Sequence, residues 1–392
     1  AEISVASKID KDHIYATEAL AKANSSATIY VERALAKVDV TATSTTGNLT
    51  DSPSVPYTIK GWILDNTNKK TYYLRNTSDY SGWLSLATNA TAPNKPAKPY
   101  RFVGDTPMES GVSLYRTYWA KDPNYSTTPS PLSTDFSTIG NSAPAALKGL
   151  DEHDYCLENT FDVPNQNQNV TTRVIVAAQL KDDGKTFYIV NDDEANLLTS
   201  DGMKDAVKAA FLSNTDVQAW LKTQLNSGMS IDKSDLEVAD ITDAGNNTPT
   251  ITIKSTSSSK FTGSAVPAFT TDIDNIVKAI KVATYKNGIS YYPVRIKHFG
   301  DDLTPWKKTE TPEPTVSAGA YPTTNQPGNY LGRYGVLRNN WYTINVEGIK
   351  KIGSPVVPEV TGDPDDEMAA YISVKINVLS WAKRTQGATL GE

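Results

Sequence analysis

The chain of 392 residues has little of the chemistry that catalysis or metal binding usually needs. Its single cysteine, Cys156, excludes an internal disulfide and a cysteine-rich metal site, and it indicates no redox compartment. No apolar run approaches the ~18 residues that a membrane-spanning helix requires. No basic-then-apolar signal peptide opens the sequence, and Ala1 in place of Met predicts a processed start.

The chain also lacks an excess of positive charge. Its formal net charge is −6, which favours solubility and gives no reason to expect binding to nucleic acid or to an anionic membrane. What is present is apolar and aromatic: 39% hydrophobic residues, with 20 Tyr and 7 Trp. This composition predicts a folded protein, and the length allows two or three domains with substantial cores.

Strand patterns dominate the first part of the chain. Residues 28–40 are rich in alternating apolar residues and end in a Thr/Ser/Gly cluster, which predicts a strand. Residues 57–64 and 70–74 flank the polar run 65–68 and predict a hairpin. Between about 76 and 145, prolines among Ser, Thr and Asn predict long surface loops and a connector.

A second unit is predicted to start near Asp154. Residues 172–180 and 186–190 surround the Asp-Gly pair at 183 and 184, which predicts a hairpin because Gly tolerates positive φ. An Asn-Gly pair at 287 and 288 predicts another hairpin, leading into a strand over 291–298.

The second unit also contains a helical insertion. Residues 200–225 change to a helical period and predict two short helices, with Ser213 and Asp216 spaced as a capping box between them. A short strand over 250–253, a helix over 273–280 and a strand over 341–346 follow.

The end of the chain combines an acidic, proline-containing stretch, 362–367, with the strand pattern of 371–381. Within that pattern Ile372, Val374, Ile376 and Val378 share one face at the two-residue period, as in a half-buried strand. This predicts a flexible leash followed by a terminal strand. Such a strand can complete its own sheet, or it can add to a neighbouring molecule and act as a polymerisation device.

Four blocks in order resemble the fimbrillins, the shaft subunits of type V pili, with the minor-fimbrium shaft subunits as the most similar members. The blocks are residues 155–161, 292–298, 332–342 and 374–381.

The resemblance implies a mainly-β fold of two transthyretin-like β-sandwich domains with a C-terminal donor-type strand. The expected units are 1–153, incomplete at its start, 154–362 with the insertion at about 200–225, and 363–392 as leash plus terminal strand. In this family, precursors are lipoproteins exported across the outer membrane and trimmed after an Arg by a trypsin-like protease. Trimming opens a groove for the C-terminal strand of the next subunit. The inserting residues would be Ile372, Val374, Ile376, Val378 and Trp381.

The resemblance further implies a structural subunit of a cell-surface fimbrium that supports adhesion and biofilm formation. Its partners would be other copies of the subunit, anchor and tip fimbrial proteins, and host or bacterial surface receptors. The alternative is a surface adhesin or glycan-binding module that does not polymerise, because exposed aromatic side chains stack on sugars. An enzyme is the third hypothesis.

The enzymatic hypothesis has little support in the motifs. None of His13, His153 and His298 lies in a zinc-protease pattern, and no Gly-x-Ser-x-Gly motif accompanies them. His298 is predicted to be an edge-strand residue, and His153 an exposed turn residue. The stretch 348–355 lacks the lysine of a phosphate-binding loop, and the acidic leash lacks the calcium-loop spacing. We therefore predict no catalytic, cofactor-binding or metal-binding residues.

Overall fold

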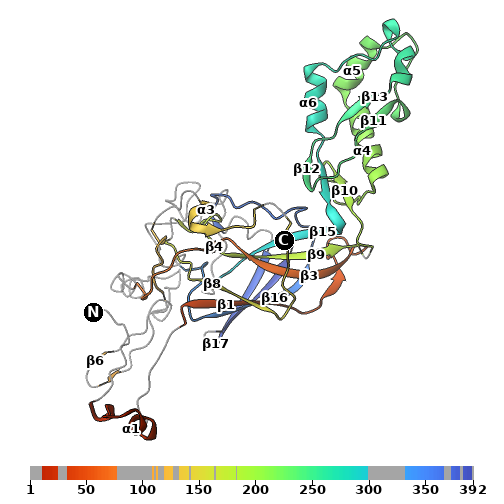
Figure 1. The fold of residues 1–392 in the computed structure, drawn as a ribbon. Helices are drawn as coiled ribbons and strands as arrows, with labels where there is room; N and C mark the ends of the chain where they lie inside the picture. The colour runs from red at the N-terminus through yellow and green to blue at the C-terminus, as the bar shows by residue number, and fades with distance from the viewer. Residues whose placement is uncertain are drawn as a thin grey trace, which may run out of the picture.

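The computed structural model describes residues 11–24, 33–76, 108–109, 112–113, 119–126, 132–140, 143–162, 165–181, 183–298, 332–365, 372–379 and 383–390. These residues form two facing β-sheets, here called sheets A and B, and an arm that projects away from them (Figure 1). Strand outweighs helix, which confirms the mainly-β prediction.

Sheet A contains the C-terminal strands. Its order is β17-β18-β16-β1-β8, in which β1 pairs parallel with β16 and antiparallel with β8, and β18 pairs parallel with β16. The outermost pair, β17 and β18, is antiparallel. The bounds are β1 Leu35–Ala42, β8 His153–Leu157, β16 Trp341–Ile349, β17 Ile372–Leu379 and β18 Lys383–Leu390.

Sheet B is antiparallel throughout, with the order β15-β9-β3-β2. Its central strand β9 is apolar on both faces. Val174 and Val176 belong to the core between the sheets, whereas Ile175 and Ala177 pack on the outer face against Val357. The bounds are β2 Thr46–Asn48, β3 Pro56–Asp65, β9 Arg173–Leu180 and β15 Ile289–Arg295.

The core of the sandwich combines strands that are far apart in the sequence. Trp62 of β3 is fully buried, and its indole N–H donates a hydrogen bond to the carbonyl of Gly149 (2.9 Å). Strands from both sides of the predicted 153/154 boundary share each sheet, because β1 pairs with β8 and β3 pairs with β9. The main core residues are Val38 and Val40 of β1, Ile59 and Leu64 of β3, Val174 to Leu180 at alternate positions of β9, Tyr292 and Val294 of β15, and Tyr342, Ile344 and Val346 of β16.

The hairpin predicted around residues 65–68 is wrong. β3 pairs with β2 and β9, and the described residues 69–75 contain no strand. The polar run is buried instead of forming an exposed turn: Asn66, with φ of 54°, donates its side-chain amide to the carbonyl of Thr171 (3.1 Å). The chain therefore passes through the body at this point rather than turning back at its surface.

The arm, residues 187–285, has a core of its own (Figure 1). The two helices predicted at 200–225 and the helix predicted at 273–280 are confirmed, but the capping box is wrong. Asn214 caps α5 instead, accepting hydrogen bonds from the backbone N–H groups of Asp216 and Val217. The arm elements are β10 Phe187–Val190, α4 Ser200–Ser213, α5 Thr215–Gln224, β11 Leu236–Val238, β12 Gly245–Asn247, β13 Ile251–Ile253, α6 Thr271–Ala279 and β14 Val282–Tyr285.

Neither hairpin predicted around the glycines 184 and 288 forms. β9 pairs with β15, whereas β10 pairs with β14, which also pairs with β12 in a three-stranded sheet of the arm. The Asn-Gly pair is the bend between β14 and β15, with φ of 55° at Asn287 and 73° at Gly288. A Cβ on Gly288 would lie 2.7 Å from the carbonyl oxygen of Leu180, so only glycine fits here.

We expect Gly288→Ala to destabilise the chain more than Gly228→Ala. Both positions have positive φ, which costs a residue with a Cβ about 1 to 2 kcal/mol. Gly228 has open space around its missing Cβ, whereas Gly288 would also clash with backbone, adding roughly 1 to 3 kcal/mol. Urea unfolding of the two variants measures the difference. Equal losses of unfolding free energy in the two variants would show that the bend at Gly288 adjusts to the added Cβ without further cost.

None of the helices in the described ranges combines the length and the hydrophobicity that a membrane span requires.

Several short elements complete the described chain. The short elements are the 3₁₀ turns Lys11–His13, Lys233–Asp235, Ser255–Lys260, Thr262–Ser264 and Lys286–Gly288, the helices α1 Glu18–Ala23 and α3 Leu132–Asp135, and the strands β4 Thr67–Asn68, β5 Met108–Glu109, β6 Val112–Ser113 and β7 Phe136–Ser137.

Candidate assembly site

The predicted terminal strand forms, and it lies at the edge of sheet A. β17 contains Ile372, Val374, Ile376 and Val378, while Trp381 lies outside the described residues. β17 does not pair with β16, because β18 lies between these two strands. Sequence reasoning missed β18, so the terminal unit is a pair of strands rather than one.

The backbone register pairs the predicted residues of β17, through β18, with buried residues of β16. Paired residues of neighbouring strands lie on the same face of a sheet, and Tyr342, Ile344 and Val346 of β16 are buried in the core. The rows are Val378, Arg384, Tyr342 and Val38; Ile376, Gln386, Ile344 and Val40; and Val374, Ala388, Val346 and Ala42.

β18 interrupts two of these rows with a polar residue, Arg384 or Gln386, and contributes Ala388 to the third. β17 contributes only branched aliphatic residues to the three rows. Among the described strands, β17 has no partner on its outer side. An edge strand presents unpaired backbone N–H and C=O groups, which are a template for pairing with another chain. Sheet A thus ends in a strand suited to a partner.

The prediction that a flexible leash begins at residue 363 is wrong for its first residues. Asp365 is 1% exposed, and its Oδ1 lies 2.9 Å from Nε of Arg295. The backbone carbonyl of Asp363 accepts a hydrogen bond from the N–H of Gln168 (2.9 Å). Residues 366–371, between this attachment and β17, lie outside the described part of the chain.

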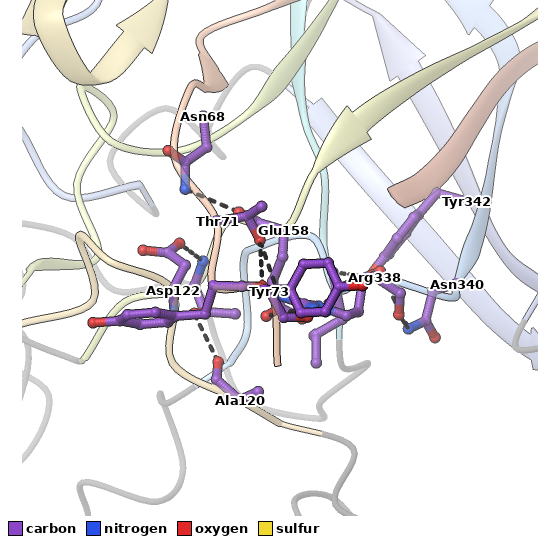
Figure 2. A network of polar contacts seen from close by, with 12 residues as sticks. Asn68, Thr71, Tyr73, Ala120, Asp122, Glu158, Arg338, Asn340 and Tyr342 are labelled. Carbon is purple, nitrogen blue, oxygen red and sulfur yellow. Dashed lines mark hydrogen bonds and ion pairs between the residues drawn. The ribbon is translucent and has the colours of Figure 1, made fainter. Parts of the chain in front are cut away.

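A buried polar network lies beside β16 (Figure 2). The guanidinium of Arg338 forms an ion pair with Glu158 (3.4 Å), and the two residues are 4% and 0% exposed. Arg338 also donates to the hydroxyl of Thr71 and the carbonyl of Tyr72, each at 2.9 Å. The side-chain amide of Asn68 donates to the carbonyl of Glu158 (2.9 Å). The network therefore fixes the loop 69–75 to the body.

Three of the four sequence blocks meet at this network. Asn159 and Val336, from the blocks 155–161 and 332–342, exchange backbone hydrogen bonds of 2.7 and 2.8 Å. The crossing is tight, because a Cβ on Gly335 (φ 129°) would lie 2.9 Å from the carbonyl oxygen of Asn159. His298, from a third block, has its Nδ1 2.7 Å from the hydroxyl of Tyr342. The three blocks thus contact one another around the start of β16.

The histidines differ in their surroundings. His298 is fully buried and lies beyond the end of the edge strand β15 at Arg295, so its assignment as an edge-strand residue is wrong. His153 is exposed and belongs to β8 rather than to a turn. Within the described ranges, no three His, Cys, Asp or Glu side chains are grouped so that they could hold a metal ion.

The network includes Asp122, a carboxyl group with a shifted pKa. Burial raises the pKa of Asp122 to about 7, opposed by hydrogen bonds from the backbone N–H groups of Thr160 and Asn124. Both N–H to carboxylate distances are 2.6 Å. Figure 2 shows Asp122 at the same network as Asn68 and Glu158.

We expect Asp122 to make the chain less stable as pH rises from about 4 to 7. The folded state keeps the proton up to about pH 7, whereas the unfolded state loses it near its ordinary pKa of about 4. The stabilisation is complete below the unfolded pKa and is lost as pH rises through the folded pKa, by at most about 1.4 kcal/mol per pH unit. Urea unfolding of the protein and of Asp122→Asn at several pH values isolates this effect. If the free energies of unfolding of the two proteins differ by the same amount at every pH, this expectation is wrong.

Comparison with known proteins adds one finding. Residues 318–387 match the family model described as "Major fimbrial subunit protein type IV, Fimbrillin, C-terminal". The match includes β16 and β17 and reaches into β18, and it supports membership of the fimbrillin family. A search of curated proteins finds no match to this chain.

Proposed function

We propose that the chain is a structural shaft subunit of a type V pilus, and that it polymerises by exchange of its C-terminal strand. The observation that carries this is the place of the family match, which coincides with the C-terminal edge of sheet A. In the exchanged state, the ladder that β18 makes with β16 is made with β16 of the neighbouring subunit. β17 accompanies β18 and covers apolar surface there.

The energetics predict a filament that is stable because its strands are extracted slowly, and not because assembly has a large favourable free energy. Burial of the four branched side chains of β17 contributes on the order of 6 to 12 kcal/mol, and each ladder hydrogen bond adds ~1 kcal/mol. Ordering the tail costs roughly 1 to 2 kcal/mol per residue. Since the same ladder forms within one chain and between two, the filament owes its durability to slow extraction of the strand.

Single-cysteine variants test the exchange directly. Thr343 of β16 and Thr385 of β18 are partners in the parallel ladder. One variant carries Thr343→Cys and the other Thr385→Cys, both in a Cys156→Ala background. The two are mixed, allowed to assemble and oxidised. Exchange predicts covalent dimers on a non-reducing gel, with fibres of the same material in electron micrographs.

The matched control replaces Thr343→Cys by Thr41→Cys. Thr41 is on β1, which is separated from β18 by β16, so it cannot reach residue 385 of an exchanged strand. Dimers that form equally with either partner would show only random collision. If the chain stays monomeric and no mixed dimer forms, the proposal is wrong.

The wider role follows from this assembly. The partners would be other copies of the same subunit, anchor and tip fimbrial proteins, and host or bacterial surface receptors. The location would be the cell surface, reached as a lipoprotein precursor through the outer membrane and followed by proteolytic trimming. The fimbrium would support adhesion and biofilm formation, and we propose no catalytic step.

A second candidate function is glycan binding by a surface module that does not polymerise. It is favoured by the loop 69–75, which Arg338 holds while Tyr73 and Leu74 remain 96% and 72% exposed. An exposed aromatic ring on a fixed loop is suited to stacking on a sugar. Glycan-array signal that is lost in Tyr73→Ala and kept in Tyr15→Ala, together with absence of fibres, would favour this function.

A further inference from the structure

Four buried charges lie together at one end of sheet B. Asp65 of β3, Arg173 of β9 and Arg295 of β15 are consecutive partners in the ladder, so they form one row across three strands. Asp365 joins them from the segment that leads to the terminal strands. The exposed fractions of these four residues are 1%, 2%, 6% and 1%, in this order. Two positive and two negative charges thus balance within the protein.

Each arginine of the row holds one end of the segment 358–365. Arg173 lies 2.7 Å from Asp65 and donates a hydrogen bond to the carbonyl of Pro358. Arg295 forms its ion pair with Asp365, which also accepts a hydrogen bond from the hydroxyl of Thr171. Burial lowers the pKa of Arg173, and the charge of Asp65 opposes this shift.

Backbone contacts fix the same segment between its ends. The carbonyl of Asp363 accepts from the N–H of Gln168, and the N–H of Asp365 donates to the carbonyl of Gln166 (3.3 Å). Just before the segment, Val357 is fully buried against Ile175 on the outer face of sheet B. The chain is therefore attached to sheet B up to Asp365.

We propose that these residues form a tail clamp, consisting of Asp65, Thr171, Arg173, Arg295 and Asp365, which transmits tension from the terminal strands to sheet B. The proposal rests on the proposed function, in which the terminal strands join one subunit to the next. Tension on β17 reaches Asp365 through residues 366–371. Because Asp365 is held by Arg295 and Thr171, the tension passes to β9 and β15 instead of peeling 358–364 from the sheet.

The clamp also sets the reach of the exchanged strands. Six residues separate Asp365 from β17, and an extended chain spans at most ~3.3 to 3.6 Å per residue. The start of β17 must then lie within roughly 25 Å of Asp365, in whichever subunit it pairs. The charged row accordingly fixes how far apart two joined subunits can be.

Pulling on single full-length chains tests the clamp without any polymer. One handle is attached at residue 392 and the other at a cysteine introduced in place of Lys60, an exposed residue of β3. In the unchanged protein, extraction of β17 and β18 should release only the residues beyond Asp365. In Asp365→Asn, a further extension of roughly 27 Å should appear at low force, because residues 358–365 detach. The lifetime of the attached segment should fall at least tenfold.

Asp363→Asn is the matched control. It makes the same chemical change two residues away, where the carboxylate accepts a hydrogen bond from the hydroxyl of Thr361 on its own segment (2.8 Å). The extra step in Asp365→Asn alone supports the clamp, and identical traces for the protein and both variants overturn it. Failed interchain cross-linking would instead refute the strand exchange and leave this result standing.

Hydrogen exchange of the unchanged protein keeps the proposal testable if Asp365→Asn does not fold. The clamp predicts that the amides of Asp365 and Gln168 are protected nearly as strongly as those of β9. Exchange of these two amides at the rate of an unstructured chain would overturn it.

Discussion

Deletion of residues 366–392 is expected to leave a folded monomer that cannot extend filaments. The deletion removes β17 and β18, while the core between sheet B and strands β1 and β16 keeps its residues. β16 then becomes an edge strand with an unpaired ladder, and no tail remains to pair with a neighbour. Circular dichroism checks the fold, and electron microscopy with size-exclusion chromatography checks assembly. Filaments of normal length from the truncated chain would refute strand exchange.

A synthetic peptide of residues 366–392 sharpens this experiment. It should bind the truncated monomer in a one-to-one complex by adding its strands to the freed edge of β16. A peptide with Ile376→Asp serves as the matched control, because residue 376 is aligned through Gln386 with Ile344, a buried residue of β16. Binding of both peptides with equal affinity would show that the aligned apolar residues of β17 and β16 do not determine how the peptide pairs with the monomer.

Replacement of Glu158 by Gln is expected to lower the free energy of unfolding by about 3 to 5 kcal/mol. The change keeps the shape of the side chain but leaves the guanidinium of Arg338 buried without its counter-ion. An uncompensated buried charge costs far more than the net value of the pair. Urea unfolding with an unchanged denaturant slope measures this loss.

Two further variants distinguish the loss of the buried ion pair from the general effect of replacing a glutamate by glutamine. Glu158→Gln combined with Arg338→Met removes both charges and should recover a large part of the loss. Glu18→Gln disrupts an exposed pair with Lys22 four residues along α1, and its effect should stay below about 0.5 kcal/mol. A loss below about 1 kcal/mol in Glu158→Gln would mean that solvent reaches the network.

The sequence predicts elements with regular apolar periods well. The strands around Val174, Ile344 and Val374 and the helices of the arm are where their periods place them. Pairing is harder to predict, because a turn signal such as Asn287-Gly288 fixes a local bend and not the partner of each strand. β1 and β16 pair across about 300 residues, and nothing local in either strand specifies the other.

β18 and the polar network were missed for different physical reasons. Residues 383–390 mix Lys, Arg, Thr and Gln with few apolar residues, so no period marks them as a strand. Glu158, Arg338 and Asp365 resemble surface charges in the sequence, because burial of a charge depends on a partner brought by the fold. Within the candidate site, the apolar face of β17 could be predicted, and its neighbour and the attachment of the leash could not.

The arm has a practical consequence for protein engineering. It leaves sheet B through β10 and β14, where Phe187, Ile189, Ala283 and Tyr285 belong to the sandwich core, and beyond this base it has a core of its own. Its exposed loop at residues 227–230, between α5 and β11, contains Gly228 and the half-exposed Met229. Foreign peptides inserted in this loop would be displayed at a distance from sheet A, so an array of such subunits could present an epitope in many copies.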